Sequence, residues 1–392
     1  MLAKISRRDF IRKGITAVGG LVIGAHALNS YFINKAVNEF SMGFRNNAPD
    51  ELWKWSKEAS HYTRLSDSVL CTLCPHGCRL GPNDRGFCRN RVNKDNKLYT
   101  IGYGNPCSVH VDPIEKKPLY HFLPATKSFS LAVAGCSFRC LNCQNWQISQ
   151  ESPEQTANID LMPENVARSA EKEGCASIAY TYSEPSTFYE YMYDTGHLAD
   201  EKGIKNVWIT SGYLNEKPLR ELCRVIHAAN VDLKGFSEQL YQKLTAGSLK
   251  PVLDTLKILK EEDVWFEITN LVVPGYTDNP DMIREMSEWI YRNLGPDYPL
   301  HISRFHPAYR LAHVPSTPES MLKKAREIAL DAGLHYVYIG NMPGSPAENT
   351  YCPNDAKLLI ERKGYSIMQN NIEDGRCKYC GEKIAGVWEN EA

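Results

Sequence analysis

The sequence predicts an α/β fold: a partial (β/α) barrel flanked by a small cysteine-rich module at each end. Short apolar runs alternate with longer stretches of helical patterning, and this alternation indicates βαβ units and a parallel sheet. The apolar runs are nearly continuous, which is typical of parallel strands that are buried on both faces. The 13 cysteines gather in groups, two of which lie outside the alternating region.

Seven apolar runs are predicted to form the strands of this sheet, which is enough to close all or most of a barrel. In chain order they are FSLAVAG (129–135), CASIAYTY (175–182), NVWITSG (206–212), NVDLKG (230–235), VWFEITNLVV (264–273), PLHISRFHP (299–307) and YVYIGN (336–341). The stretches predicted to be helices are 163–174, 184–203, 219–228, 249–263, 280–293 and 319–333.

These patterns divide the chain into five segments. Residues 1–30 form a signal-like segment, and residues 31–65 form a linker with a short helix around ELWKWSKEA. Residues 66–125 are expected to be a cysteine-rich module with a short strand or two, and residues 126–345 the barrel. Residues 346–392 return to cysteine-rich, hairpin-like sequence and are expected to be a zinc-ribbon-like module.

The first 30 residues have the pattern of a secretory signal: a basic start, a short apolar stretch and small residues at 25–27. Arg7 and Arg8 resemble the paired arginines of a Tat signal. The pattern favours export or membrane tethering. An ordinary basic N-terminus and a cytoplasmic catalytic domain are the alternative.

Composition narrows the classes of partner and of cysteine chemistry. The formal net charge of −1 provides no strong field for nucleic acid or for a membrane surface. The odd cysteine count and the metal-ligand spacings favour metal or redox chemistry over a disulfide framework. Nucleic acid is therefore not an expected partner.

The most specific motif is GCSFRCLNCQNW, which directly follows the first predicted strand. Its three cysteines are Cys136, Cys140 and Cys143, on a loop at the end of the barrel where active sites lie. Thiolates select zinc or iron–sulfur clusters, and three thiolates on a [4Fe–4S] cube leave one iron open for a substrate. A zinc ion closed by a distant fourth ligand is the alternative.

This C-x3-C-x2-C motif resembles the signature of radical S-adenosylmethionine (SAM) enzymes, although Asn142 stands where that family usually has an aromatic residue. The resemblance implies a [4Fe–4S] cluster that binds SAM and cleaves it reductively to a 5′-deoxyadenosyl radical, which abstracts hydrogen from a substrate. Later motifs resemble the pyruvate formate-lyase (glycyl-radical) activating enzymes. The stretch DPIEKKPLYHF (112–122), TYSEP, YIGN and the cysteine-rich ends resemble the radical SAM member of the Amme–Memo–RadiSAM system.

The resemblance implies a set of SAM-binding residues at successive strand ends, while residues that act on the substrate stay unassigned. Glu184 stands where the acidic residue that holds the SAM amino group occurs, with Tyr182 and Ser183 in place of two glycines. Ser211 matches a polar SAM contact. Asp232 and Lys234 match an Asp-x-Lys pair whose lysine binds the carboxylate, and His306 matches a histidine that contacts the ribose.

Two further cysteine sets flank the barrel. The N-terminal set, predicted to hold structural zinc or a second, closed cluster, is Cys71, Cys74, Cys78 and Cys88. The C-terminal set, a candidate zinc site in which aspartate replaces a cysteine, is Cys352, Asp355, Cys377 and Cys380. A degenerate C-terminal site without metal is the alternative.

The sequence thus predicts a radical SAM enzyme with an unidentified substrate, for which a protein is one candidate. A reductant is an expected partner, and the family implies proteins that resemble Amme and Memo. One alternative is a glycyl-radical activase that acts on a partner protein. A second is an exported iron–sulfur electron carrier without SAM chemistry.

Overall fold

The structure is a computed structural model that describes residues 52–342 and 344–389. The predicted Tat-like segment 1–30 and most of the predicted linker therefore lie outside the described residues. Within those two ranges, no helix is both long enough and apolar enough to cross a membrane.

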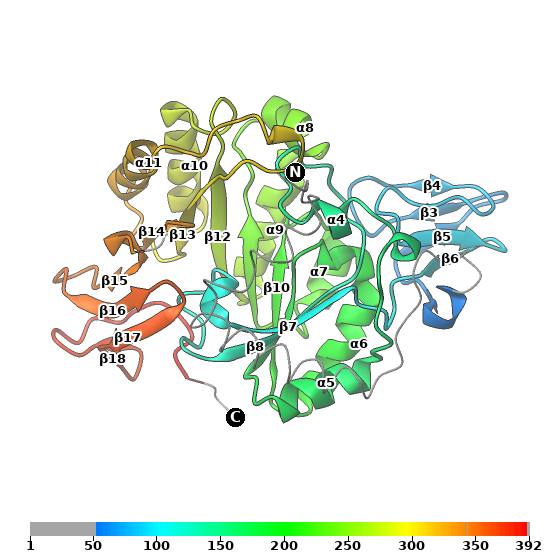
Figure 1. Ribbon diagram of the computed structural model, residues 1–392, viewed down its shortest axis with the longest axis horizontal. Helices are drawn as coiled ribbons and strands as arrows, with labels where there is room; N and C mark the ends of the chain where they lie inside the picture. The colour runs from blue at the N-terminus through cyan, green and yellow to red at the C-terminus, as the bar shows by residue number, and fades with distance from the viewer. Residues whose placement is uncertain (1–51, 343, 390–392) are drawn as a thin grey trace, which may run out of the picture. The chain divides into compact units, whose positions relative to one another are not determined.

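An eight-stranded sheet runs through the middle of the described residues (Figure 1). Its strands are β7 (Ser108–Pro113), β8 (Lys127–Ala132), β9 (Ser177–Tyr180), β10 (Lys205–Thr210), β11 (Ala228–Asp232), β12 (Trp265–Val272), β13 (Leu300–Arg304) and β14 (Val337–Gly340). Strands β8 to β14 are parallel and lie in chain order, whereas β7 is antiparallel to β8. Because β7 and β14 are the two edges of this sheet, the barrel is open, as the sequence predicted.

All seven predicted strands are present, but β7 was not predicted. Residues Ser108 to Pro113 are mostly half-buried along an edge, with Ser108 opposite Ala132 and Pro113 opposite Lys127. An edge strand of this kind lacks the continuous apolar run of a central parallel strand. The sheet therefore begins before residue 126, inside the range that was expected to be a separate cysteine-rich module.

Helices connect the parallel strands and pack on the sheet. They are α4 (Trp146–Ser149), α5 (Pro163–Lys172), α6 (Tyr189–Asp200), α7 (Glu216–Leu222), α8 (Glu238–Thr245), α9 (Leu249–Glu261), α10 (Pro280–Asn293) and α11 (Glu319–Asp331). Short 3-10 turns are η2 (Ile114–Lys116), η3 (Pro153–Gln155), η4 (Pro185–Phe188) and η5 (Tyr309–Leu311). The helices α4 and α8 were not predicted, because neither is long enough to show a clear helical period.

Helix α10, the longest among the described residues, shows how local sequence sets these elements. The Asn279 side chain accepts hydrogen bonds from the amides of Asp281 and Met282 at 2.8 and 3.1 Å, and Pro280 begins the helix. Its buried face carries Ile283, Met286 and Ile290, spaced by three and four residues. The helix ends just before Gly295, which adopts a positive φ of 106°.

The N-terminal cysteine-rich region contains two three-stranded antiparallel sheets, more than the strand or two predicted. Its strands are β1 (Lys57–Glu58), β2 (Tyr62–Arg64), β3 (Val69–Cys71), β4 (Arg79–Leu80), β5 (Arg91–Lys94) and β6 (Lys97–Thr100). Of the helix predicted around residues 51–59, the described residues show helical structure only at Leu52 and in the 3-10 turn η1 (Trp53–Trp55). It ends there because the Ser56 hydroxyl bonds to the Trp53 carbonyl at 2.7 Å and the chain then extends into β1.

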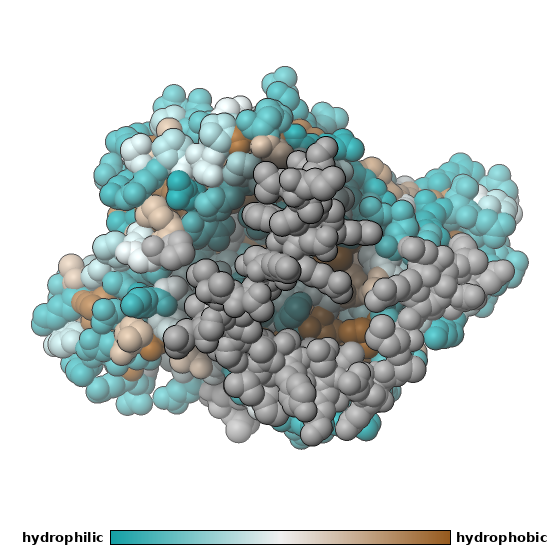
Figure 2. Space-filling view, viewed as in Figure 1, coloured by the Kyte–Doolittle hydropathy of each residue, from teal (hydrophilic) through white to brown (hydrophobic). Residues whose placement is uncertain are grey.

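The C-terminal region is built from short antiparallel strands that follow the 3-10 turn η6 (Pro346–Glu348). They are β15 (Thr350–Tyr351), β16 (Leu358–Lys363), β17 (Ser366–Asn370), β18 (Ile372–Glu373) and β19 (Arg376–Cys377). The buried Arg362 guanidinium fastens this region by donating to the Tyr120 carbonyl at 2.9 Å. Figure 2 shows hydrophobic patches on the surface of this region. Met368 on β17 is 62% exposed.

Candidate functional site

The loop after β8 carries the three cysteines of the predicted cluster site. It turns at Gly135, where φ is 103° and an added Cβ would lie 2.4 Å from the Cys88 carbonyl oxygen, so that only glycine fits. Cys136, Cys140 and Cys143 all line one cavity of about 430 Å³. The cavity lies at the carboxyl ends of the strands, which is the end where barrels of this kind place their sites.

Hydrogen bonds to helix α8 and within the loop itself hold this loop in place. The amide of Arg139 donates to the Thr245 carbonyl at 2.7 Å, and the amide of Leu141 donates to the Leu244 carbonyl at 3.0 Å. The Arg139 guanidinium in turn donates to the carbonyl of Cys136 at 3.0 Å. Helix α8, which was not predicted, thus holds the cluster loop through its last turn.

The spacing of the three thiols suits a cluster better than a single ion. Within the described residues, these three sulfur atoms do not form a set that lies mutually within 4.8 Å, whereas four thiolates on one zinc are about 3.8 Å apart. Burial raises the pKa of Cys136, and it raises that of Cys140 to about 12. A bound cation is what makes such thiols thiolates. The residues therefore fit a [4Fe–4S] group.

Glu184 lies where the ends of β9 and β10 meet, and its carboxylate accepts five hydrogen bonds. One oxygen accepts from the Ser186 amide at 3.1 Å, the Ser186 hydroxyl at 2.7 Å and the Thr210 hydroxyl at 2.7 Å. The other accepts from the amide and hydroxyl of Ser211 at 2.8 and 2.6 Å. All five donors are neutral, so the negative charge stays uncompensated at the cavity wall. The structure thus brings Ser211 to Glu184, and it adds Thr210, which the sequence analysis missed.

Asp232 and Lys234 follow the end of β11 and line the same cavity. The Lys234 Nζ atom lies 2.9 Å from the Asp232 carboxylate. Burial opposes protonation of Lys234, but the attraction of Asp232 outweighs it and raises the lysine pKa above its ordinary value. The ammonium charge is therefore kept, next to the cysteine loop.

His306 is the one predicted SAM residue that does not line the cavity. It follows β13, where Phe305 turns inward and packs with Leu244 and Leu311. Alternation of side chains then sends His306 outward, and it is exposed, with Nδ1 3.3 Å from the Ser316 hydroxyl. Its role at the ribose stays a prediction, while Ser303 and Asn341 line the cavity at neighbouring strand ends.

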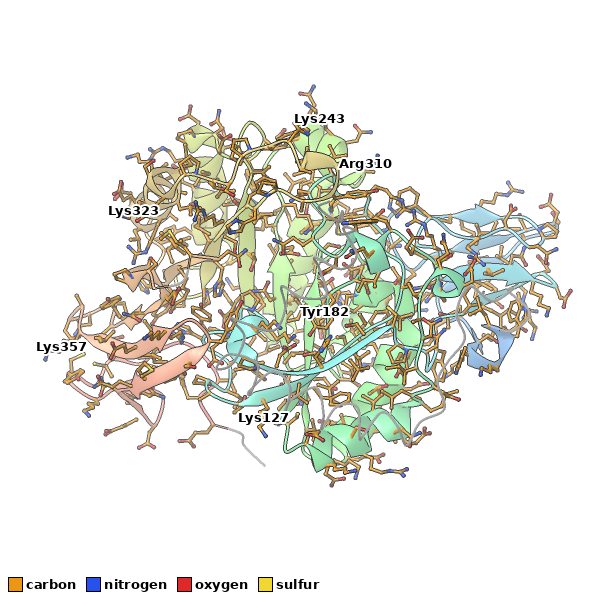
Figure 3. The ribbon with its side chains drawn as sticks, viewed as in Figure 1. Lys127, Tyr182, Lys243, Arg310, Lys323 and Lys357 are labelled. Atoms are coloured by element: carbon orange, nitrogen blue, oxygen red, sulfur yellow. The ribbon has the colours of Figure 1, made fainter. Side chains whose placement is uncertain are left out.

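A charged network beside the cavity was missed as a site, although its residues Lys116, Lys117 and Tyr182 line the cavity. The Asp112 carboxylate contacts the Lys117 Nζ at 2.6 Å, the Lys116 Nζ at 2.8 Å and the Tyr182 hydroxyl. The Asp112 pKa is held low, because these donors outweigh its burial. Figure 3 labels Tyr182 close to β7, the strand that carries Asp112. The motif DPIEKKPLYHF contains Asp112, Lys116 and Lys117. Because strand β7 was not predicted, the sequence did not indicate that these residues lie beside the cavity.

Tyr182 has an unusual backbone conformation. Its φ is +64°, in the left-handed region that favours glycine. A tyrosine in this region is strained, so its side-chain contacts have to outweigh the strain. The hydroxyl contact to Asp112 and the buried Lys117 hold the side chain in place.

The four N-terminal cysteines line a second, smaller cavity that abuts the cluster loop. Ser137, between Cys136 and Phe138, lines it too. The sulfur atoms of Cys71, Cys74, Cys78 and Cys88 form no compact set either: within the described residues no three of them lie mutually within 4.8 Å.

The C-terminal set differs, because its four ligand atoms are close together. The ligand atoms of Cys352, Asp355, Cys377 and Cys380 all lie within 4.8 Å of one another. The sulfur atoms of Cys352 and Cys380 are 3.6 Å apart, and one buried Asp355 oxygen has no hydrogen-bond partner. This geometry fits a single tetrahedral ion.

A scan against protein families matches residues 131–290 to the radical SAM superfamily. An uncharacterized protein of Methanocaldococcus jannaschii is 48% identical over 331 residues, which is 84% of this chain and 98% of that protein. The chain belongs to the radical SAM superfamily. In this superfamily a [4Fe–4S] cluster and SAM are implied, and the C-x3-C-x2-C loop lies within the matched residues.

More distant similarity follows the activating-enzyme branch. Pyruvate formate-lyase 1-activating enzyme of Escherichia coli is 26% identical over 178 residues, which is 44% of this chain and 71% of that enzyme. A solved radical SAM methyltransferase from Sphaerobacter thermophilus aligns with 73% of this chain and 76% of its own length, at 11% identity and a TM-score of 0.45. The family match and the similarity to the Escherichia coli enzyme show that the chain is an enzyme of radical SAM type with distant activating-enzyme similarity.

Proposed function

We propose that this radical SAM protein cleaves SAM reductively and uses the resulting 5′-deoxyadenosyl radical to abstract hydrogen from a substrate. The observation that carries the proposal is one cavity lined by three cysteines, a buried carboxylate and a paired lysine: Cys136, Cys140, Cys143, Glu184 and Lys234. The cluster, when bound, supplies the electron and an open iron. The residues of the chain supply binding, orientation and charge.

Each charged residue of the cavity matches one charged group of SAM. Lys234 offers an ammonium to the carboxylate, as a compact counter-charge that Asp232 keeps protonated. Glu184 offers its negative charge to the amino group, and Ser211 and Thr210 hold that carboxylate in position. Asn142 lines the cavity with a buried side-chain oxygen that lacks a hydrogen-bond partner. We propose that this oxygen accepts a hydrogen bond from the adenine, and that this bond takes the place of an aromatic contact.

The substrate side of the cavity is the wall formed by Lys116, Lys117, Tyr182 and Tyr365. Lys116 and Lys117 share the single Asp112 carboxylate, so this wall keeps a net positive charge that favours a substrate with an anionic group near its reacting carbon. Asp112, Lys116 and Lys117 come from the motif that resembles the Amme–Memo–RadiSAM system, so we propose membership of that system and partners that resemble Amme and Memo. Glycyl-radical activation of a partner protein is a second candidate, supported by the similarity to the pyruvate formate-lyase activating enzyme.

The proposal is tested by SAM binding to the reconstituted full chain. Iron and sulfide are added anaerobically, and electron paramagnetic resonance spectra are recorded with and without SAM after reduction. We expect SAM to change the cluster signal of the wild type. Cys140→Ala should lose the SAM-responsive signal, whereas Cys107→Ser, at an isolated half-buried cysteine, should retain it. A wild-type cluster that does not respond to SAM would favour the electron-carrier alternative.

A further inference from the structure

The small cavity at the N-terminal cysteines has the features of a second cluster site. Its wall includes the four sulfur-bearing residues Cys71, Cys74, Cys78 and Cys88. Four thiolates around one zinc ion lie about 3.8 Å apart, because each Zn–S bond is about 2.3 Å. Within the described residues no three of these sulfurs are mutually within 4.8 Å, although the C-terminal set meets that limit. A cube, whose thiolates bind four different irons at its corners, needs the wider spacing.

Two buried donors line this cavity without a hydrogen-bond partner. Arg91 is 1% exposed and donates from its NH2 group to both Glu190 oxygens, at 2.8 and 2.9 Å, which leaves its Nε–H unpaired. The Ser137 hydroxyl is also buried and unpaired in a residue that is 2% exposed. Buried donors normally have a hydrogen-bond partner. Two buried donors without a partner in one cavity wall therefore indicate an acceptor that binds there. The sulfur atoms of an iron–sulfur cluster are such acceptors, and hydrogen bonds to them set its potential.

The same cavity lies directly against the SAM cluster loop. Ser137 lines it while the adjacent Cys136 lines the SAM cavity, and the His76 imidazole contacts the Ser137 carbonyl at 2.7 Å. The Cys88 carbonyl closely approaches Gly135. A short stretch of backbone therefore separates the two sets of thiols, and a cluster with four thiolates has no open iron for SAM.

We propose that Cys71, Cys74, Cys78 and Cys88 hold a second [4Fe–4S] cluster that passes electrons to the SAM cluster. A low-potential one-electron donor, such as a reduced ferredoxin, is oxidised by one electron and reduces this cluster. The cluster is reoxidised when it reduces the cluster on Cys136, Cys140 and Cys143, and no proton moves in either step. This electron transfer, which we call the relay, rests on the proposed SAM chemistry. The presence of the second cluster does not depend on that chemistry.

The first test is the metal content of the anaerobically reconstituted full chain. We expect about eight irons and eight sulfides in the wild type and in the matched control Cys107→Ser, since two cubes hold four of each. Cys140→Ala and Cys74→Ser should each retain about four irons, with the SAM-responsive signal kept only in Cys74→Ser. Circular dichroism checks that each variant is folded. If a variant is not folded, the iron and sulfide content of the wild type alone decides whether a second cluster is present. Four irons with an additional zinc that Cys74→Ser loses would overturn the proposal, as would four irons alone.

The second test separates the relay from the cluster. With reduced ferredoxin as donor, 5′-deoxyadenosine formation by Cys74→Ser should fall by at least about tenfold, which corresponds to 1.4 kcal/mol in the barrier. With dithionite, which is small enough to enter the SAM cavity, the rate should stay close to that of the wild type. Equal effects with both donors would overturn the relay. If the wild type makes no 5′-deoxyadenosine but Cys140→Ala keeps its iron, the proposed function fails and the second cluster stands.

Discussion

The N-terminal and C-terminal cysteine sets have similar ligand types but different geometry. The N-terminal cysteines are spread around a cavity with two orphaned donors, next to the SAM cluster loop. The C-terminal ligands are gathered within 4.8 Å, on hairpins fastened to the other end of the sheet by Arg362 and His121. Widely spaced thiols suit a redox-active [4Fe–4S] cluster, and closely spaced ligand atoms suit one structural metal ion. The comparison shows that the arrangement of cysteines in space carries more information about the metal than their number does.

Removal of a C-terminal ligand should have the largest effect on stability. We predict that the wild type holds about one zinc in this set and that Cys380→Ser loses it. Because a structural metal contributes folding energy directly, the free energy of unfolding should fall by more than about 4 kcal/mol. Elemental analysis and chemical denaturation measure both effects. Iron should be unchanged, so a loss of iron in Cys380→Ser would contradict the division between the two sets.

Replacement of Lys234, which lines the cavity together with the loop cysteines, should weaken SAM binding. Lys234→Ala removes a charge-assisted hydrogen bond, which costs about 1.5–3 kcal/mol. SAM affinity should therefore fall roughly 10- to 150-fold, as measured by titration of the SAM-induced spectral change. Lys127→Ala, at an exposed lysine that Figure 3 labels on β8, is the matched control and should bind SAM as the wild type does. Unchanged affinity in Lys234→Ala would remove this residue from the site.

The attachment of the C-terminal region should be sensitive to acid through His121. Its ring contacts the Ala385 carbonyl at 2.6 Å and the Tyr338 hydroxyl at 2.5 Å, and burial lowers its pKa to about 4. The unfolded chain, with a histidine pKa near 6.5, binds the proton first as pH falls. The resulting loss of stability begins at about pH 6.5 and is complete near pH 4.

Thermal unfolding of the metal-free full chain between pH 7 and 5 measures this effect. Over that range the histidine should cost the wild type about 2 kcal/mol, because one pKa unit corresponds to 1.36 kcal/mol. His121→Gln should be less stable at pH 7 but should lose less on acidification. Parallel curves for the two proteins would show that another group is responsible.

The smallest predicted effect concerns Tyr182 on the substrate wall. Tyr182→Phe removes the hydroxyl that bonds to Asp112, while Lys116 and Lys117 still satisfy that carboxylate. The free energy of unfolding should fall by about 1 kcal/mol, with SAM affinity unchanged. Tyr182→Gly suits the positive φ but also removes the ring that contacts Lys117 and His110, so it should be the more destabilised of the two in denaturation experiments. A large loss of SAM affinity in Tyr182→Phe would place this residue in the SAM site instead.

Sequence patterns predicted the central sheet well, because buried parallel strands are continuous apolar runs whose order follows the chain. The edge strand β7 and helix α8 were missed, since β7 is a half-buried edge strand without a continuous apolar run and α8 is a short helix. Both matter for the site: β7 places Asp112 in contact with Lys116, Lys117 and Tyr182, which line the cavity, and α8 holds the cysteine loop.

Site residues could be predicted only where a motif fixes their position. The three loop cysteines, Glu184 and Lys234 meet in one cavity because they follow neighbouring parallel strands. His306 shows the limit of this reasoning, since one inward-facing residue before it, Phe305, decides which way its side chain points. The contact between the cysteine loop and the N-terminal cysteines could not be predicted, because it joins segments that no pairing pattern connects.

The most direct test of the account is whether the reduced full chain cleaves SAM. Wild-type protein with its clusters reconstituted anaerobically is incubated with dithionite and SAM, and 5′-deoxyadenosine and methionine are quantified by chromatography. The account predicts that both products form with the wild type and that neither forms with Cys140→Ala. Intact clusters that yield no 5′-deoxyadenosine in the wild type would contradict it.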